Sequence, residues 1–106
     1  MLKAYDRVQL GVFPTPLQEM KNLSRYLGGP RIFIKRDDLS GLALGGNKVR
    51  KLEYILADAR QQKADVIITI GAVTFNHARQ TAAAAALLGL ECQLVLIGRQ
   101  PATVQG

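Results

Sequence analysis

The first apolar pattern along the chain has helical spacing and begins near Thr15. Thr15 can cap a helix, Pro16 suits the first helical position, and Gln18 three residues after Thr15 completes a capping box. Apolar side chains then share one helical face, and the glycines and proline of residues 28–30 stop the helix. That face consists of Leu17, Met20, Leu23 and Leu27. The pattern predicts a helix that starts at Thr15 and ends near Leu27.

Two further stretches have the same helical period. Residues 48–62 follow a glycine-rich loop (41–46), and Asn47 stands where an N-cap is expected. Val49, Leu52, Leu56 and Ala59 would form the inward face of this helix. Residues 76–88 precede Gly89 and contain a run of alanines, whose small side chains would let the helix lie close to a sheet. The pattern predicts helices at both places.

Short apolar runs between these stretches indicate strands. Residues 32–34 lie between charges, residues 93–97 follow the last helix, and residues 66–70 form an uninterrupted apolar run. Such a run is typical of a strand that is buried on both faces of a parallel sheet. The order strand, helix, strand, helix, strand predicts an α/β fold, a βαβαβ segment with a parallel sheet. The chain stops in loop-like residues where a further helix would cover the last strand, so we expect an incomplete fold.

Composition fits a globular domain and restricts its partners. With 48% hydrophobic residues, the chain is too apolar to be disordered. The net charge of +6 raises the possibility of nucleic-acid binding, but the basic residues cluster at 31–36 and 48–51 with few aromatic residues between them. That distribution favours a small anionic ligand over nucleic acid.

Cysteine content and hydropathy bear on compartment. Cys92 is the only cysteine, which excludes an intrachain disulfide and a thiolate metal cluster, and its apolar surroundings predict a buried, inert thiol. The N-terminus lacks a basic region followed by a long apolar stretch, so we expect no signal peptide, and no run reaches the roughly 18 apolar residues of a membrane span. We therefore expect a cytoplasmic protein without a membrane or metal partner.

The candidate chemistry lies in two loops that lead into helix N-termini, residues 41–48 and 71–77. Helix N-termini favour anions, and ligands of open α/β sheets bind beyond the carboxyl ends of the strands. The first loop is not a nucleoside-triphosphate loop, because Asn47 replaces the required lysine and Val49 the required hydroxyl residue. Lys48 begins a helix with Lys51 one turn later, which disfavours a protonated ammonium and suits a nucleophilic lysine. A surface cluster of basic residues without a ligand is the alternative.

Several blocks in order resemble one enzyme family. The segment Gly45-Gly46-Asn47-Lys48-Val49-Arg50-Lys51-Leu52-Glu53-Tyr54 resembles the lysine segment of the D-cysteine desulfhydrase/1-aminocyclopropane-1-carboxylate (ACC) deaminase family, which uses pyridoxal phosphate (PLP). Upstream, Phe13-Pro14-Thr15-Pro16-Leu17 and Ile34-Lys35-Arg36-Asp37-Asp38-Leu39 also resemble that family. Downstream, Gly71 to Thr81 resembles its substrate-binding loop and helix start. The resemblance runs along nearly the whole chain.

The resemblance implies a fold, a cofactor and roles for particular residues. The fold would be that of fold-type II PLP enzymes, like the tryptophan synthase β subunit, with residues 1–47 in the larger domain and 48–106 beginning the smaller one. Lys48 would be the Schiff-base lysine and would move a proton at the substrate carbon. Asn76 would bind the cofactor's 3-oxygen, and Lys51 its phosphate. The loop Thr74-Phe75-Asn76-His77 would face the carboxylate of a small amino-acid substrate.

The same resemblance implies β-elimination or deamination that yields a keto acid and ammonia, usually in a homodimer. Two departures bear on this. Thr74-Phe75 replaces the usual Gln-Ser, which removes a hydroxyl and adds apolar bulk. Family members are also several times longer, so we expect the 106-residue chain alone to lack a competent active site. An inactive truncated remnant that keeps the fold and a basic phosphate-ligand-binding module are the alternative functions.

Two polar groups allow a second interpretation. His77 can flank the substrate carboxylate or simply occupy a first helical turn at the surface. Asp37-Asp38 can be read as paired catalytic carboxylates, but the neighbouring Lys35 and Arg36 favour a turn with local ion pairs.

Overall fold

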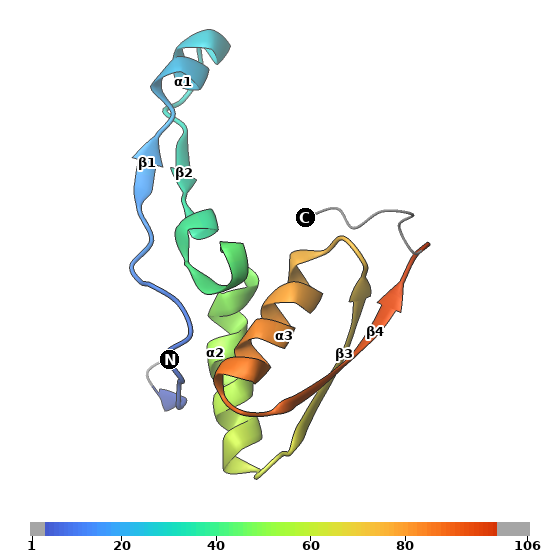
Figure 1. Ribbon diagram of the computed structural model, residues 1–106. Coiled ribbons are helices and arrows are strands. Elements are labelled where there is room, and N and C mark those ends of the chain that lie inside the picture. Colours follow the sequence, from blue (N-terminus) through green and yellow to red (C-terminus); the bar gives the residue numbers. More distant parts are fainter. Residues whose placement is uncertain (1–3, 100–106) are drawn as a thin grey trace.

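The computed structural model describes residues 4–99 and divides them into a hairpin arm and a helix–sheet unit (Figure 1). The arm contains β1 (Leu17–Glu19), α1 (Lys21–Leu27) and β2 (Phe33–Lys35). Two short 3-10 helices, η2 (Asp37–Leu39) and η3 (Leu42–Leu44), connect it to the second unit. The helix–sheet unit contains α2 (Lys48–Gln61), β3 (Val66–Ala72), α3 (Asn76–Leu87) and β4 (Glu91–Ile97). None of these helices is long and apolar enough to cross a bilayer.

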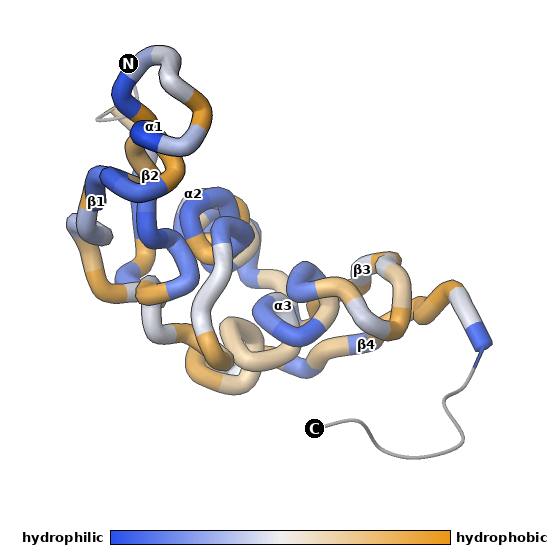
Figure 2. Tube along the Cα trace, turned by 90° about the horizontal axis from the view of Figure 1, so that it is seen from above, coloured by the Kyte–Doolittle hydropathy of each residue, from blue (hydrophilic) through white to orange (hydrophobic). Residues whose placement is uncertain are grey.

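The β3–α3–β4 unit confirms the predicted α/β class with parallel strands. β3 and β4 pair in parallel from Val66 opposite Glu91 to Ala72 opposite Ile97, and α3 covers one face of the pair (Figure 1). The expected burial of both faces is not found in residues 4–99, because alternate residues of a strand point to opposite faces and the second face is uncovered there. Ile68 and Ile70 on that face are 64% and 57% exposed. Figure 2 shows the hydrophobic residues of both strands as orange segments at the margin of the molecule.

The core lies between α2, α3 and the segment before β1. Val49, Leu52 and Leu56 are buried as predicted, and Ala59 is half-buried against them. Leu10 from the N-terminal segment and Ala84 from α3 complete the buried cluster. Ala84 and Ala85 are fully buried, and α3 packs against both α2 and the strands as the alanine run predicts. Each buried leucine contributes about 1.5–3 kcal/mol by leaving water.

The helix predicted from Thr15 is partly wrong. Its end is confirmed, since Gly28 takes a left-handed conformation (φ 63°) after α1. Residues 17–19, however, form β1, and α1 begins only at Lys21. The hydroxyl of Thr15 does not cap a helix but donates a hydrogen bond of 2.8 Å to Asp37, while the Pro16 carbonyl accepts one of 2.9 Å from the Arg36 amide. These contacts to distant residues hold the backbone extended.

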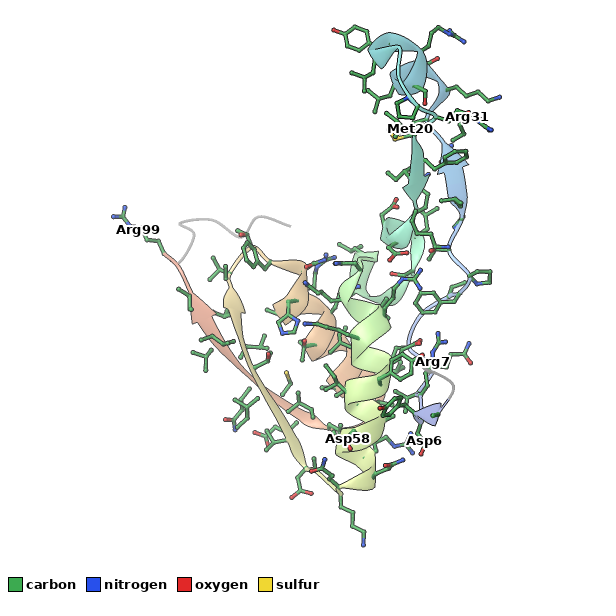
Figure 3. The ribbon with its side chains drawn as sticks, turned by 180° about the vertical axis from the view of Figure 1, so that it is seen from behind. Asp6, Arg7, Met20, Arg31, Asp58 and Arg99 are labelled. Atoms are coloured by element: carbon green, nitrogen blue, oxygen red, sulfur yellow. The ribbon has the colours of Figure 1, made fainter. Side chains whose placement is uncertain are left out.

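The strand predicted at 32–34 lies one residue later and in a different sheet. β2 pairs antiparallel with β1, from Leu17 opposite Lys35 to Glu19 opposite Phe33. This two-stranded sheet is separate from β3–β4, so the first strand of the predicted βαβαβ order does not join the parallel sheet in residues 4–99. The backbone N–H and C=O groups of β2 pair with those of β1, a segment that the sequence pattern had assigned to a helix. Arg31 and Met20 lie at the end of the arm away from α2 (Figure 3).

Candidate functional site

Lys48 is the first residue of α2 and follows a loop with an unusual backbone. Gly41, Gly45 and Gly46 have φ angles of 92°, 77° and 143°, and Ala43 and Leu44 are also left-handed at 47° and 67°. The segment around η2 holds the backbone of Gly46 in place: the Gly46 amide donates hydrogen bonds of 2.9 Å to the Asp37 carbonyl and 3.1 Å to Ser40 Oγ. The Lys48 side chain is half-buried and Lys51 is exposed. The lysine therefore starts α2 at the end of a strained loop that is anchored at Gly46.

The loop before α2 and the N-terminus of α3 meet at Gly46. A Cβ on Gly46 would lie 2.8 Å from Asn76 Nδ2 and 2.9 Å from Gln80 Oε1. Asn47 makes no side-chain cap; instead its Oδ1 accepts a hydrogen bond of 3.2 Å from Asn76 Nδ2. Asn47 thus occupies the predicted N-cap position of α2, but its side chain is bonded to the neighbouring helix and does not make the capping hydrogen bond. The two loops that the sequence singled out as candidate ligand sites thus lie side by side.

His77 lies in the first turn of α3 and is half-buried. Its Nε2 shares a hydrogen bond of 2.9 Å with Thr69 Oγ1 on β3, and its Nδ1 is buried without a partner among the described residues. Burial lowers the pKa of the imidazole, and the positive charges of Lys51 and Lys48 lower this pKa further. His77 is therefore held mainly neutral at physiological pH, close enough to both lysines to sense their charge.

Thr74 and Phe75 form the exposed turn before α3. The Phe75 amide donates a hydrogen bond of 3.0 Å to the Ala72 carbonyl, and Phe75 precedes α3 in an extended conformation without capping it. The Phe75 side chain is 62% exposed. Both side chains are thus available to a ligand at this end of α3, and neither contributes to the core.

A polar network beside the lysine loop contains one ion pair that the sequence indicated and one that it did not. Asp37 accepts two hydrogen bonds from Arg50, of 2.6 and 2.7 Å, and Arg50 also donates one of 3.0 Å to Thr15 Oγ1. The Arg50 guanidinium holds the pKa of Asp37 down to about 2. Asp38 pairs with Arg36 at 2.8 Å as predicted, whereas Asp37 pairs with Arg50 rather than with a sequence neighbour. Arg50, two residues after Lys48, thereby ties α2 to η2.

Other candidate sites among residues 4–99 carry no comparable chemistry. Cys92 is half-buried rather than fully buried, and burial raises the pKa of its thiol, so the less reactive protonated form is favoured. A cavity of about 850 Å³ lies in the hairpin arm and is lined by β1, the start of α1 and β2; Lys48 does not line it. No group of three or more histidine, cysteine, aspartate or glutamate side chains in the described chain could hold a metal.

Comparison with known proteins decides the family. The profile of the family described as pyridoxal-phosphate dependent enzyme matches residues 8–105. The chain belongs to this family of PLP-dependent enzymes. It is 53% identical over 95 residues to the D-cysteine desulfhydrase of Salmonella newport, covering 90% of this chain and 29% of that protein. It is 52% identical over 100 residues to a Pyrococcus horikoshii protein provisionally named ACC deaminase, covering 94% of this chain and 30% of that protein.

A solved structure shares the fold of this PLP-enzyme segment. The crystal structure of an ACC deaminase homologue superposes with a TM-score of 0.87 at 53% identity, over 92% of this chain and 30% of that chain. The family resemblance inferred from the lysine segment is thus confirmed. The chain spans about 30% of the length of these relatives, over their N-terminal part.

The residues at Gly46 fit a PLP molecule. A Cβ at Gly46 would lie 2.8 Å from Asn76 Nδ2 and 2.9 Å from Gln80 Oε1, so only glycine lets these polar groups approach the backbone before Lys48. Gln80 Oε1 is buried without a partner among residues 4–99. The start of α2 provides backbone amides and the charges of Lys48 and Lys51, which suit a phosphate. An aldehyde requires a nucleophilic lysine, a ring oxygen requires an amide N–H donor, and a phosphate requires cationic groups; all three kinds of group are present here.

Proposed function

We propose that the protein containing this chain catalyses PLP-dependent β-elimination or deamination of a small amino acid and releases a keto acid and ammonia. The observation that supports this most strongly is the close approach of Asn76 to Gly46, which brings Lys48 and the start of α3 to one place. Relatives named D-cysteine desulfhydrase and ACC deaminase support the reaction class.

In this proposal PLP, when bound, supplies the electron sink that stabilises negative charge at the substrate carbon. Lys48 holds the cofactor through Nζ and moves the proton at that carbon. Asn76 donates a hydrogen bond to the 3-oxygen, and Lys51 attracts the phosphate. Asn47 supports Asn76, because its Oδ1 accepts one of the two N–H groups and leaves the other for a ligand.

The segment from Thr74 to His77 would bind the substrate carboxylate. His77 is neutral and fixed by Thr69, so its ring can take part in a hydrogen bond without adding a charge. Phe75 presents an exposed apolar ring at the position where the family resemblance implies a serine hydroxyl. We therefore propose a substrate whose side chain is larger or less polar than that of D-cysteine.

A cofactor-binding experiment tests the proposal in the complete gene product. PLP should produce a visible absorption band that borohydride abolishes, and Lys48→Ala should lose the band while the exposed control Lys63→Ala keeps it. Release of keto acid from D-cysteine, cysteate and ACC then identifies the substrate. A wild-type protein without the band would contradict PLP chemistry and favour a phosphate-binding module; a band without turnover of any amino acid would favour the inactive remnant.

For the complete protein, the boundary near residue 47 and the homodimer remain predictions of the family resemblance. The cytoplasmic location remains a prediction from the sequence pattern.

A further inference from the structure

The loop before Lys48 is strained and needs external support. Ala43 and Leu44 have left-handed backbones with φ angles of 47° and 67°, which side-chain-bearing residues rarely adopt. Such conformations persist only where the surrounding structure over-determines them. Ser40 and Asp37 anchor the end of the loop at Gly46 but do not hold its centre, residues 42–44.

Helix α3 holds the centre of the loop through Gln80 and Arg79. Gln80 Nε2 donates a hydrogen bond of 3.1 Å to the Leu42 carbonyl, and Arg79 donates one to the Ala43 carbonyl. Gln80 is completely buried, whereas Arg79 is exposed. The Gln80 bond is partly shielded from water and the Arg79 bond is exposed, so water replaces the Gln80 bond less readily and Gln80 is the more important of the two supports.

The buried amide of Gln80 is not explained by packing alone. Its Oε1 has no hydrogen-bond partner among residues 4–99. This oxygen lies close to Gly46, 2.9 Å from where a Cβ on that glycine would stand. A buried unpaired acceptor is unfavourable, and an apolar side chain of similar volume would avoid this cost. The amide is thus suited to holding the loop, and its free oxygen faces the junction of Gly46 and Asn76.

We propose that Gln80 is a positioning residue for Lys48: it holds the strained loop against α3, so that Lys48 and Asn76 face the same ligand. The claim that Gln80 places Lys48 for reaction with PLP rests on the proposed function. The claim that Gln80 supports the loop does not depend on any cofactor.

The test compares Gln80→Met with Gln62→Met in the complete gene product. Methionine matches the length of glutamine but cannot donate to the Leu42 carbonyl. Gln62 is an exposed glutamine at the C-terminal end of α2, and its side chain bonds Asp58 alone among residues 4–99, so it serves as the matched control. Without cofactor, amide hydrogen exchange of residues 41–46 should be about tenfold faster in Gln80→Met than in wild type or control, with an unchanged midpoint of global unfolding.

With PLP, the rate at which Lys48 becomes borohydride-trappable should also fall about tenfold in Gln80→Met. Wild-type exchange and wild-type trapping rates would overturn the inference, and faster loop exchange with an unchanged trapping rate would reduce Gln80 to a structural role. Gln80→Asn, which keeps the amide but shortens its reach, should reproduce both effects if the methionine variant does not fold. Failure of wild-type Lys48 to be trapped would instead contradict the proposed function, and the exchange measurement would still test Gln80.

Discussion

A buried carboxylate joins the N-terminal segment to α2, and its removal should be severely destabilising. Glu53 is completely buried on α2, and its Oε1 accepts hydrogen bonds of 3.0 Å from the Leu10 amide and 3.2 Å from the Gly11 amide. Its Oε2 pairs with Arg7, which lies beside α2 (Figure 3). Hydrogen bonds to a charged acceptor contribute about 1.5–3 kcal/mol each.

The structure gives an order for two substitutions. Glu53→Ala leaves two buried amides unpaired and should lower the free energy of unfolding by about 3–6 kcal/mol. Glu53→Gln keeps an oxygen that can accept from both amides, but the two bonds become neutral and the pairing with Arg7 is lost. Because the Arg7 side chain is 46% exposed, solvent screens its share, and the total loss should be about 2–3 kcal/mol, smaller than that of the alanine variant.

Urea unfolding of the complete gene product, followed by circular dichroism, measures both values. Native-state hydrogen exchange at Leu10 and Gly11 localises the effect, since these amides should lose protection in Glu53→Ala and keep it in Glu53→Gln. An alanine variant within about 1 kcal/mol of wild type, or with unchanged protection at both amides, would refute the reasoning.

Two further predictions concern the polar network and the glycines. The pKa of Asp37 is lowered from 3.8 to about 2, so the stability that its charge contributes is complete above the unfolded pKa and disappears as the pH falls toward 2. The free energy of unfolding, measured at pH 7, 4 and 3, should therefore decline less in Asp37→Asn than in wild type. Parallel declines in the two proteins would contradict the Arg50 pairing. In Gly45→Ala the new Cβ would lie 1.8 Å from the Asp38 carbonyl oxygen, whereas in Gly28→Ala it meets open space. Both positions have a positive φ angle, which an alanine rarely adopts. The free energy of unfolding, measured by thermal denaturation, should therefore fall by about 1–2 kcal/mol in Gly28→Ala and by clearly more in Gly45→Ala. Equal losses would exclude the clash.

The elements that the sequence predicted correctly are those fixed by local signals. α2, α3, β3 and β4 each have a clear apolar period, and glycines or turns bound them within a few residues. Lys48 was singled out because it begins a helix after a loop, and that placement depends only on neighbouring residues. The role of Asn76, which begins α3, came from the family resemblance.

The features that the sequence missed depend on distant partners. Thr15 was assigned to a helix cap because Pro16 and Gln18 follow it, but its hydroxyl binds Asp37, 22 residues later. Asn47 binds Asn76, 29 residues away, in place of capping its own helix. Glu53 is a charged residue on an apolar face, and only the folded position of the Leu10 and Gly11 amides explains its burial. No periodicity along the chain indicates such pairs.

The most direct test of the account is to identify the lysine that carries the cofactor. The complete gene product would be incubated with PLP, reduced with borohydride, digested and sequenced by mass spectrometry. We predict a pyridoxyl group on Lys48 and none on Lys51, which lies one turn further along the same helix. An unmodified Lys48, or modification shared evenly among the surface lysines, would contradict the assignment of this site.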